Sequence, residues 1–293
     1  MWSWVPTARA CRPVDPAVEG GRGFPRVADD AGPVKAQELL TALRANPAGT
    51  ALFTDFDGTL SPIVSDPATA RPAPGAVAAL VSLVTRYRKV AVLSGRPLSF
   101  LAPLLPVSID IGALYGLEQR IDGRAGEHPE ARRWRPLVTD LTGHAVAAFA
   151  TVVGITVEPK GLSLTVHYRN APHAAPAVQA WAQGAAERTG MLARAAKASV
   201  ELHPPVAVDK GTMLQAWAAG AEVVAYFGDD LGDLAAFDAL RTMTQDPTSP
   251  TRQGLAVVIV GPETPAAVRQ AADVLLEGPT ALATLLQRLA AAS

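Results

Sequence analysis

Two aspartates, Asp55 and Asp57, stand two residues apart at the end of a short apolar run that begins at Ala51. The run predicts a buried strand, and the turn signal at Gly58 predicts where that strand stops. Side chains two apart on a strand point the same way, so we expect both carboxylates to face one spot at its carboxyl end. Ligands bind at that edge of an open α/β sheet. Two carboxylates held together need a cation or a shared proton, so the pair predicts a nucleophile, an acid or base, and half of a metal site.

Gly58 supports the same interpretation, because glycine lets the backbone turn and approach a ligand with N–H groups that can hold an anion. The alternative is a solvated Asp-Gly turn after a strand. Short motifs often match by chance, so this stretch alone does not decide between the two.

The composition is that of a globular protein with a sizeable core. The chain has 293 residues, enough for one large domain or two modest ones, and 49% of them are hydrophobic and 18% charged. A net charge of −1 gives no reason to expect a nucleic acid or an anionic membrane as partner. A single cysteine, Cys11, excludes an internal disulfide framework and a cysteine-based metal cluster.

The chain shows no sign of a membrane segment. No apolar run approaches the ~18–20 residues that span a bilayer, and the first residues lack the features of a signal peptide. We therefore expect a cytoplasmic protein, and the sequence leaves its oligomeric state open.

Strands and helices alternate on both sides of the aspartate pair. Residues 1–34 are rich in Pro, Gly, Arg and Asp without any period, and we expect a flexible N-terminal tail there. Hydrophobic spacing then predicts helices at 35–46, 76–87, 98–105, 209–219, 234–240 and 281–291. It predicts further buried strands at 89–93, 108–114, 222–227 and 256–260, the last of these being the final strand. Strand, helix and strand in succession form a right-handed parallel crossover.

The pattern changes between residues 123 and 206. A polar, turn-rich stretch leads into a helix, a hairpin, a second helix, and one or two further strands. In the hairpin, polar and apolar residues alternate, with Ser163, Thr165, His167 and Arg169 on one face. We therefore predict an α/β fold: a Rossmann-like parallel-sheet core of residues 35–122 and 207–293, with an inserted α+β domain at 123–206.

Four polar motifs stand at strand ends or helix starts of the predicted core. They are Asp55-x-Asp57-Gly58-Thr59, Ser94-Gly95-Arg96, Lys210 and Gly228-Asp229-Asp230-x-x-Asp233. In this order and spacing they resemble the haloacid dehalogenase superfamily of phosphohydrolases. Each motif is weak alone, but the ordered set of four is specific and favours a catalytic site over a solvated turn.

Further motifs resemble one family of that superfamily, the trehalose-6-phosphate phosphatases. They are the stretch from Asp55 to Val64 followed by Asp66-Pro67, Tyr115-Gly116-Leu117-Glu118, Glu158-x-Lys160, His167-x-Arg169, Glu201 with Pro204 nearby, and Asp209-Lys210-Gly211. The resemblance runs from about residue 48 to near the end of the chain. Two motifs depart from the family pattern: Gly232 and Leu234 replace the common Thr and Glu, and Tyr115 replaces the usual His.

The resemblance implies hydrolysis of a phosphate ester through an aspartyl phosphate. Asp55 is the implied nucleophile, and Asp57 is the acid that protonates the leaving sugar oxygen and then the base that activates water. The implied cofactor is Mg²⁺, which prefers oxygen ligands. Its implied ligands are Asp55, the carbonyl of Asp57, Asp229 and Asp230, with Asp233 supporting them from nearby.

The implied phosphate contacts are the positive charge of Lys210 and the hydroxyl of Ser94. Other implied substrate contacts in the core are Gly58, Thr59, Gly95, Arg96 and Glu118. From the residues alone, plainer interpretations stay open: Lys210 as a solvated lysine at a helix start, and Ser94 or Asp233 as a helix N-cap.

The inserted domain is implied to be a cap that closes over the site and selects the sugar. Its implied sugar contacts are Glu158, Lys160, His167, Arg169 and Glu201. The alternative is that this polar face is simply solvated, as one face of a small antiparallel sheet often is. His128, His144, His173 and His203 show no ligand spacing and are expected at the surface.

The function implied is Mg²⁺-dependent hydrolysis of trehalose 6-phosphate to trehalose and phosphate, with a small sugar phosphate as the partner. Alternatives left open are another sugar phosphatase of the superfamily, acting on sucrose phosphate or a mannosyl or glucosyl phosphoglycerate, and a phosphomutase. A phosphorylated signalling receiver is disfavoured because both aspartates share one strand and because of the insertion. An inactive sugar-binding regulator is disfavoured because Asp55, Asp57 and Asp229 are all present.

Overall fold

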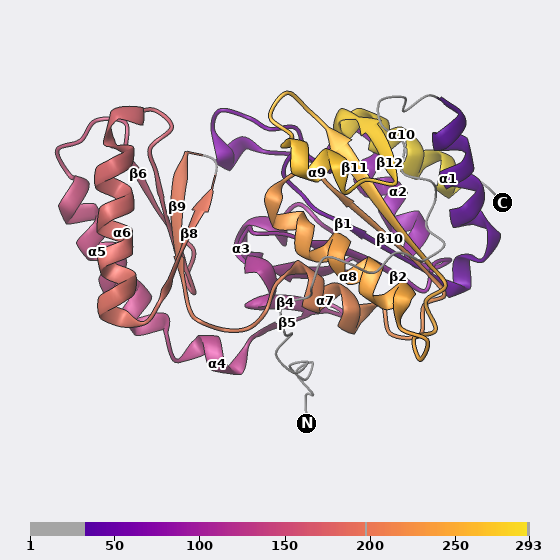
Figure 1. Ribbon diagram of the computed structural model, residues 1–293, viewed down its shortest axis with the longest axis horizontal. Helices are drawn as coiled ribbons and strands as arrows, with labels where there is room; N and C mark the ends of the chain where they lie inside the picture. The colour runs from indigo at the N-terminus through magenta and orange to yellow at the C-terminus, as the bar shows by residue number, and fades with distance from the viewer. Residues whose placement is uncertain (1–32, 197, 292–293) are drawn as a thin grey trace. The chain divides into compact units, whose positions relative to one another are not determined.

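The computed structural model describes residues 33–196 and 198–291 (Figure 1). Most of the tail predicted at 1–34, including Cys11, therefore lies outside the described residues. Residues 33 and 34 are described and belong to the first helix. The described chain forms two compact units. The first joins the residues up to Ala125 with those from Val208 onward, and the second is Gly126–Ala207.

An eight-stranded sheet forms the centre of the first unit, in the order β12-β11-β10-β1-β2-β3-β4-β5. The pairs from β12 to β3 are parallel, and β4 is antiparallel to β3. The α/β prediction is therefore confirmed. The strand bounds are β1 Thr50–Thr54, β2 Lys89–Leu93, β3 Asp110–Ala113, β4 Glu118–Ile121, β5 Arg124–Glu127, β10 Val223–Gly228, β11 Gln253–Val260 and β12 Val274–Glu277.

Helices cover both faces of this sheet. They are α1 Pro33–Ala45, α2 Ala76–Val84, α3 Leu98–Leu101, α7 Lys210–Trp217, α8 Leu234–Gln245, α9 Ala266–Gln270 and α10 Gly278–Ala291. Successive side chains of β1 point to opposite faces, so Leu52 joins one core cluster and Phe53 the other. Both faces of a central parallel strand are buried in this arrangement, and every residue of β1 is buried.

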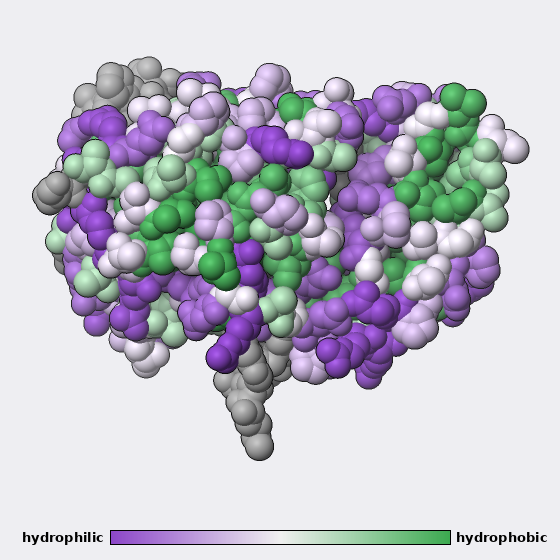
Figure 2. Space-filling view, turned by 180° about the vertical axis from the view of Figure 1, so that it is seen from behind, coloured by the Kyte–Doolittle hydropathy of each residue, from purple (hydrophilic) through white to green (hydrophobic). Residues whose placement is uncertain are grey.

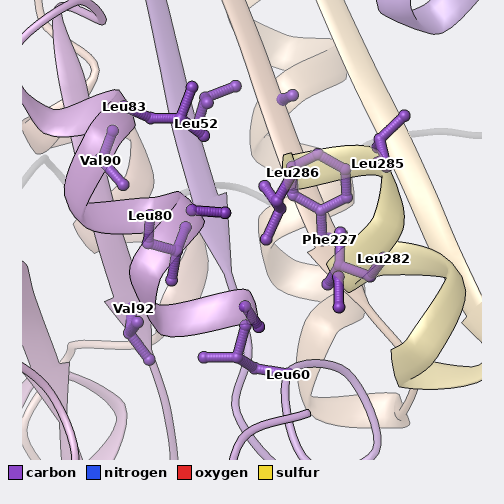
Figure 3. Close-up of a cluster of buried hydrophobic side chains, with 14 of the residues drawn as sticks. Leu52, Leu60, Leu80, Leu83, Val90, Val92, Phe227, Leu282, Leu285 and Leu286 are labelled. Atoms are coloured by element: carbon purple, nitrogen blue, oxygen red, sulfur yellow. The ribbon is translucent and has the colours of Figure 1, made fainter. Parts of the chain in front are cut away.

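The cluster that contains Leu52 packs the sheet against α2 and α10 (Figure 3). Its side chains come from segments far apart in the sequence: Leu52, Leu60, Leu80, Leu83, Val90, Val92, Phe227, Leu282, Leu285 and Leu286. The opposite cluster packs Phe53 and Tyr226 against Leu214 of α7 and Phe237 of α8. Burial of this much aliphatic and aromatic surface on each face holds the strand ends in fixed positions.

The first strand ends earlier than the sequence predicts. It stops at Thr54, and the backbone N–H of Asp55 makes a final bond to the carbonyl of Phe227, at 2.8 Å. The chain then turns: the N–H groups of Leu60 and Ser61 both donate to the carbonyl of Phe56. Asp57 lies in this turn, so the expectation that the two aspartates share one strand is wrong.

The prediction that 256–260 is the last strand is also wrong. The short strand β12 follows β11 and pairs with it in parallel, and α9 connects them. β12 has only four residues, too few to show a period.

The second unit is a four-stranded sheet in the order β6-β7-β9-β8, with helices packed on one face. The bounds are α4 Pro129–Arg132, α5 Arg135–Phe149, β6 Thr156–Pro159, β7 Leu164–His167, α6 Ala175–Thr189, β8 Leu192–Ala196 and β9 Ser199–His203. β6 and β7 form the antiparallel hairpin that the alternation predicts. Leu164, Val166, Val200 and Leu202 pack against α5 and α6, so the intervening residues form the other, polar face.

Large apolar side chains remain at scattered surface positions of both units, and Figure 2 shows apolar residues among polar ones on one side of the molecule. In residues 33–196 and 198–291, no helix has the length and apolar character needed to cross a membrane.

Candidate active site

Three strand ends and one helix start bring the predicted core residues together. Asp55 follows β1, Ser94 follows β2 and Asp229 follows β10. Both β2 and β10 pair with β1 in parallel, so all three residues lie at the same edge of the sheet. Lys210, the first residue of α7, reaches this edge with its ammonium group.

A buried charge network centres on Lys210. Its Nζ lies 2.8 Å from Oδ1 of Asp55 and 2.7 Å from Oδ1 of Asp233, and all three residues are buried. Burial alone lowers the pKa of Lys210, but the carboxylates of Asp233 and Asp55 outweigh burial and raise that pKa well above its ordinary value. Lys210 therefore keeps its charge, and the interpretation as a solvated lysine is wrong.

The site holds an excess of negative charge. Burial raises the pKa of Asp55 well above its ordinary value; Asp233, Asp230 and Asp229 add to this, and Lys210 opposes it. A carboxyl group in such surroundings is relieved either by a proton or by a nearby cation. The electrostatics thus favour a bound cation beside Asp55.

Asp233 organises the loop that follows β10. Its Oδ2 accepts hydrogen bonds from the N–H groups of Asp229, at 2.8 Å, and Asp230, at 3.0 Å. Its Oδ1 accepts from Lys210 and from the hydroxyl of Tyr226, at 2.6 Å. Asp233 therefore does more than cap a helix, because it fixes both the acidic loop and the lysine.

Tyr226 is a residue of the core site that the sequence did not predict. It is fully buried in β10, and burial, followed by the Asp233 carboxylate, raises the pKa of its phenol well above its ordinary value, so the hydroxyl stays a donor. The available signal was a tyrosine in the middle of a buried strand, where its hydroxyl requires a partner.

Asp229 packs against the turn that follows Asp55. A Cβ on Gly58 would lie 2.1 Å from Oδ2 of Asp229, so only glycine leaves room for this carboxylate. Thr59 donates to Oδ1 of Asp229 at 3.0 Å. The left-handed φ of 82° at Gly58 is a second reason for glycine there.

Carboxylate oxygens of Asp55, Asp229 and Asp233 come within 4.8 Å of one another, and such a buried cluster can bind a divalent metal. Both oxygens of Asp233 already accept hydrogen bonds, so Asp55 and Asp229 are the better ligands of the three. Asp230, predicted as a ligand, accepts the Gly232 N–H at 2.8 Å and lies outside this group. A donor set of carboxylate oxygens suits a hard cation.

The carboxylate of Asp57 has a different cationic partner. Arg96 binds it at both ends, with Nε 2.6 Å from Oδ2 and Nη2 2.8 Å from Oδ1. Ser94 is buried and accepts the Arg96 N–H at 3.2 Å. The residue that precedes α3 as its N-cap is Pro97, so the interpretation of Ser94 as an N-cap is wrong. Glu118 accepts the N–H of Leu98 at 2.7 Å, which ties it to the start of α3.

In the second unit, the predicted sugar contacts gather on the polar face. Glu158 lies opposite Thr165, and Thr165 lies opposite Glu201. Glu158 pairs with Nε2 of His167 at 2.7 Å, and Glu201 accepts from Ser163 at 2.7 Å and lies 3.7 Å from Lys160. Arg169 lies just beyond the end of β7.

The same face carries two residues that were not predicted as sugar contacts. The hydroxyl of Thr165 is buried without a hydrogen-bond partner among the described residues. Arg194 of β8 lies opposite Glu201, and it was missed because the predicted module left the number of strands after its second helix open. The expectation that all four histidines lie at the surface is wrong for His128, which is buried and accepts the N–H of Glu130.

Comparison with known proteins shows the family of this chain. Residues 53–266 match the sequence model of the family described as trehalose-phosphatase. The chain belongs to the trehalose-phosphatase family. The resemblance drawn from the motifs is thereby confirmed.

Curated relatives of the family are similar over the same region. The chain is 37% identical over 202 residues to the trehalose-phosphate phosphatase of Mycobacterium avium, a match that covers 65% of this chain and 51% of the relative. It is 34% identical over 206 residues to that of Mycobacterium leprae, covering 65% and 48%. The chain thus spans about half the length of the curated relatives it matches.

Solved structures share the fold. The C-terminal domain of Candida albicans trehalose-6-phosphate phosphatase superposes with a TM-score of 0.70 at 21% identity, covering 87% of this chain and 96% of that one. Aspergillus fumigatus trehalose-6-phosphate phosphatase superposes with a TM-score of 0.58 at 25% identity, covering 88% and 98%.

Two of the departures from the family pattern are neighbours in space. A Cβ on Gly232 would lie 3.5 Å from Cε1 of Tyr115, and a Cβ on Gly95 would lie 2.5 Å from its hydroxyl oxygen. Tyr115 itself has a left-handed φ of 56°, and its N–H donates to the carbonyl of Ser94. The larger ring at 115 thus lies beside the smaller residue at 232. Leu234, the third departure, packs against the core cluster of Phe53.

Proposed function

We propose that this chain hydrolyses trehalose 6-phosphate to trehalose and inorganic phosphate through a phosphorylated Asp55. The observation that carries the proposal is the buried group of Asp55, Lys210, Asp233 and Asp229 at one sheet edge, in a member of the trehalose-phosphatase family. Phosphate monoesters hydrolyse so slowly in water that catalysis must supply a rate factor of up to ~10²¹. Splitting the reaction into two displacements at phosphorus is one way to reach it.

Asp55 acts as the nucleophile. One of its carboxylate oxygens forms a bond to phosphorus as the bond from phosphorus to the sugar oxygen breaks. The ammonium of Lys210, held at 2.8 Å from Asp55, provides positive charge where the phosphoryl oxygens gather. Ser94, buried at the neighbouring strand end, donates a hydrogen bond to the phosphate.

Mg²⁺ is the proposed cofactor. Asp55, the backbone carbonyl of Asp57, and Asp229 would hold it, with Asp230 at the border of the site. When bound, it supplies the positive charge that favours ionised Asp55 and offsets the charge of the phosphate. The all-oxygen donor set and the crowding of carboxylates support this choice.

Asp57 handles the protons. In the first step its carboxyl proton passes to the sugar oxygen as that oxygen leaves. In the second step the carboxylate takes a proton from the water that attacks the phosphorus of the aspartyl phosphate. Free phosphate is then released, and both aspartates return to their starting states.

The second unit selects the sugar. Glu158, Lys160, His167, Arg169 and Glu201 remain the proposed contacts, in the role of a cap domain at 123–206. Buried polar groups that hydrogen-bond substrate hydroxyls reject analogues lacking them by ~10⁴–10⁵. The buried hydroxyl of Thr165 has no hydrogen-bond partner in the part of the chain that the structure describes, which supports the proposal that this face takes a polar ligand.

A substrate panel tests the proposal. Phosphate release is measured with Mg²⁺ from trehalose 6-phosphate, sucrose 6-phosphate, glucosyl and mannosyl phosphoglycerate, and glucose 6-phosphate. We expect the highest kcat/KM for trehalose 6-phosphate, and loss of activity on chelation. A higher kcat/KM for another sugar phosphate would contradict trehalose 6-phosphate as the substrate. An isomerised product without free phosphate would indicate a phosphomutase. Full activity in strong chelator would contradict the metal. A cytoplasmic location stays a prediction.

A further inference from the structure

We propose that Arg96 is a positioning residue for Asp57, and that its fork of two hydrogen bonds aims the carboxyl group that exchanges a proton with the leaving oxygen. The proposal deepens the proposed function and rests on it. It also revises the expectation that Arg96 serves the substrate directly.

The contact is bidentate. Nε and Nη2 of Arg96 each donate to a different oxygen of Asp57, at 2.6 and 2.8 Å. A single bond would leave the carboxylate free to rotate, whereas two parallel bonds fix both its position and its plane. The Asp57 side chain is 30% exposed and lies in a turn outside the sheet, so little else in its own segment restrains it.

The guanidinium group is itself held in place. Its Cζ lies 4.4 Å from the ring centroid of Phe100 in the short helix α3, which is a cation–π contact. Phe100 in turn meets the ring of Phe56 edge to face, with centroids 5.8 Å apart. Phe56 is fully buried and directly precedes Asp57 in the sequence. Contacts therefore run from Asp57 to Arg96, on to the two rings and back to the Asp57 segment, and together they orient the carboxylate.

The backbone of Arg96 is also fixed at both ends. Its N–H donates to the hydroxyl of Ser94, and its carbonyl accepts the N–H of Leu114. Arg96 is thus tied to the ends of β2 and β3. A side chain anchored in this way loses little entropy when it holds a partner.

The site therefore contains two separate pairs of a cation and a carboxylate. Lys210 serves Asp55, and Arg96 serves Asp57. The fork takes one lone pair from each oxygen of Asp57, which leaves the other lone pairs available for a proton. Asp57 can thus remain paired with Arg96 while it donates to the sugar oxygen.

The leaving group separates positioning from phosphate binding. A sugar alkoxide leaves poorly and needs the proton from Asp57, whereas a nitrophenolate leaves without one. If Arg96 aims Asp57, its loss harms the first displacement on a sugar phosphate far more than the first displacement on p-nitrophenyl phosphate. The second displacement starts from the same aspartyl phosphate with both substrates, so kcat/KM, which reports the first displacement, is the quantity to compare. If Arg96 instead binds the phosphate, both substrates suffer alike, because both carry the same phosphate.

The experiment compares the two substrates in the wild type and in Arg96→Ala. We expect kcat on trehalose 6-phosphate to fall about 10²-fold with little change in KM, since a misplacement of about 1 Å can cost that much. We expect kcat/KM on p-nitrophenyl phosphate to fall less than about 5-fold, whereas kcat/KM on trehalose 6-phosphate should follow the fall in kcat. Equal losses on the two substrates, or no loss on the sugar phosphate, would overturn the proposal.

Three further variants sharpen the result. Arg96→Lys keeps the charge without the fork, so we expect at least a ~10-fold loss on the sugar phosphate to persist; full recovery would refute the bidentate role. In Asp57→Asn, the added Arg96→Ala change should cause little further loss, because the two residues act as a unit; multiplied losses would refute it. Arg86→Ala, which removes contacts to the carbonyls of Leu289 and Ala290, is the matched control and should affect both substrates equally.

The test stays informative if the proposed substrate is wrong. A wild type that is inactive on trehalose 6-phosphate but active on another sugar phosphate contradicts the proposed function alone. The same comparison is then made with that sugar phosphate, which also has an alkoxide leaving group.

Discussion

The charge network around Lys210 and the polar face of the second unit both consist of charged residues, but they are built differently. In the first, Lys210, Asp233 and Tyr226 are joined by bonds of 2.6–2.7 Å and are fully buried. In the second, two contacts of 2.7 Å are also present, between Glu158 and His167 and between Ser163 and Glu201. However, Lys160 and Glu201 lie 3.7 Å apart, and the buried hydroxyl of Thr165 has no partner among the described residues.

In the proposed function, this difference assigns chemistry to the network and recognition to the polar face. A network whose members satisfy one another is preorganised, and it stabilises developing charge without further rearrangement. A face that retains a long ion pair and an unpaired hydroxyl has polar groups left for a ligand. Changes in the network should therefore act on kcat and on stability, and changes in the polar face should act on substrate choice.

The largest effect is expected from Asp55→Asn. The amide cannot attack phosphorus, so we expect kcat to fall by about 10⁴-fold or more on every phosphate ester, the good leaving group included. Phosphate release from trehalose 6-phosphate and from p-nitrophenyl phosphate is the measurement. Full activity in this variant would remove Asp55 as the nucleophile.

Lys210→Met should damage both activity and stability. It leaves the carboxylates of Asp55 and Asp233 buried without their cation, which typically costs about 3–5 kcal/mol of unfolding free energy. We expect kcat to fall by about 10²–10³-fold as well. Urea unfolding measures the first effect. Asp238→Ala, which removes an ion pair to Arg241 between largely exposed side chains, is the control and should change stability by less than about 1 kcal/mol.

Glu201→Gln tests the polar face. Its amide oxygen can still accept from Ser163 but no longer pairs with Lys160 as an anion. We expect KM for trehalose 6-phosphate to rise about 10-fold, which is the loss of about 1.4 kcal/mol of binding. Hydrolysis of p-nitrophenyl phosphate, which carries no sugar, should change less than about 2-fold. An equal loss on both substrates would mean that the polar face does not select the sugar.

The contrast between the two regions also marks what the sequence could predict. Apolar runs predicted β1, β2 and β10, and polar residues directly after them predicted Asp55, Ser94 and Asp229 at one edge. The bond from Tyr226 to Asp233 and the fork from Arg96 to Asp57 join residues whose pairing depends on how the strands and α3 pack. No local period encodes such contacts. β12 and β8 were missed or left open for a simpler reason, because four or five residues show too little alternation.

His203 should make the second unit sensitive to acid. Burial lowers the pKa of His203, with Arg194 adding to this and Glu201 opposing it. The neutral form is therefore favoured when folded, and stability is retained above the ordinary histidine pKa of about 6.5. Below it the unfolded chain gains a proton that the folded chain resists, so stability falls as the pH drops through the lowered value.

Hydrogen exchange in β7 and β9 at pH 7.5 and 5.5 should show this loss, and His203→Gln should reduce it. An unchanged pH response in that variant would assign the effect elsewhere, His128 being the next candidate because burial lowers its pKa too.

Gly232→Thr is expected to have the smallest effect, although it lies within the active-site loop. The new Cβ would lie 3.1 Å from Oδ1 of Asp230, which must shift by a few tenths of an ångström, and 3.5 Å from the ring of Tyr115, which is an ordinary van der Waals contact. Gly232 is not among the glycines with a left-handed φ, so threonine meets no backbone strain there. We expect kcat/KM to change less than about 3-fold and stability by less than about 0.5 kcal/mol.

The Tyr115→His change frees the space beside residue 232, and the pair of substitutions should therefore cost less than the sum of the two single changes. Additive losses would show that residues 115 and 232 do not interact energetically, although they are neighbours in space.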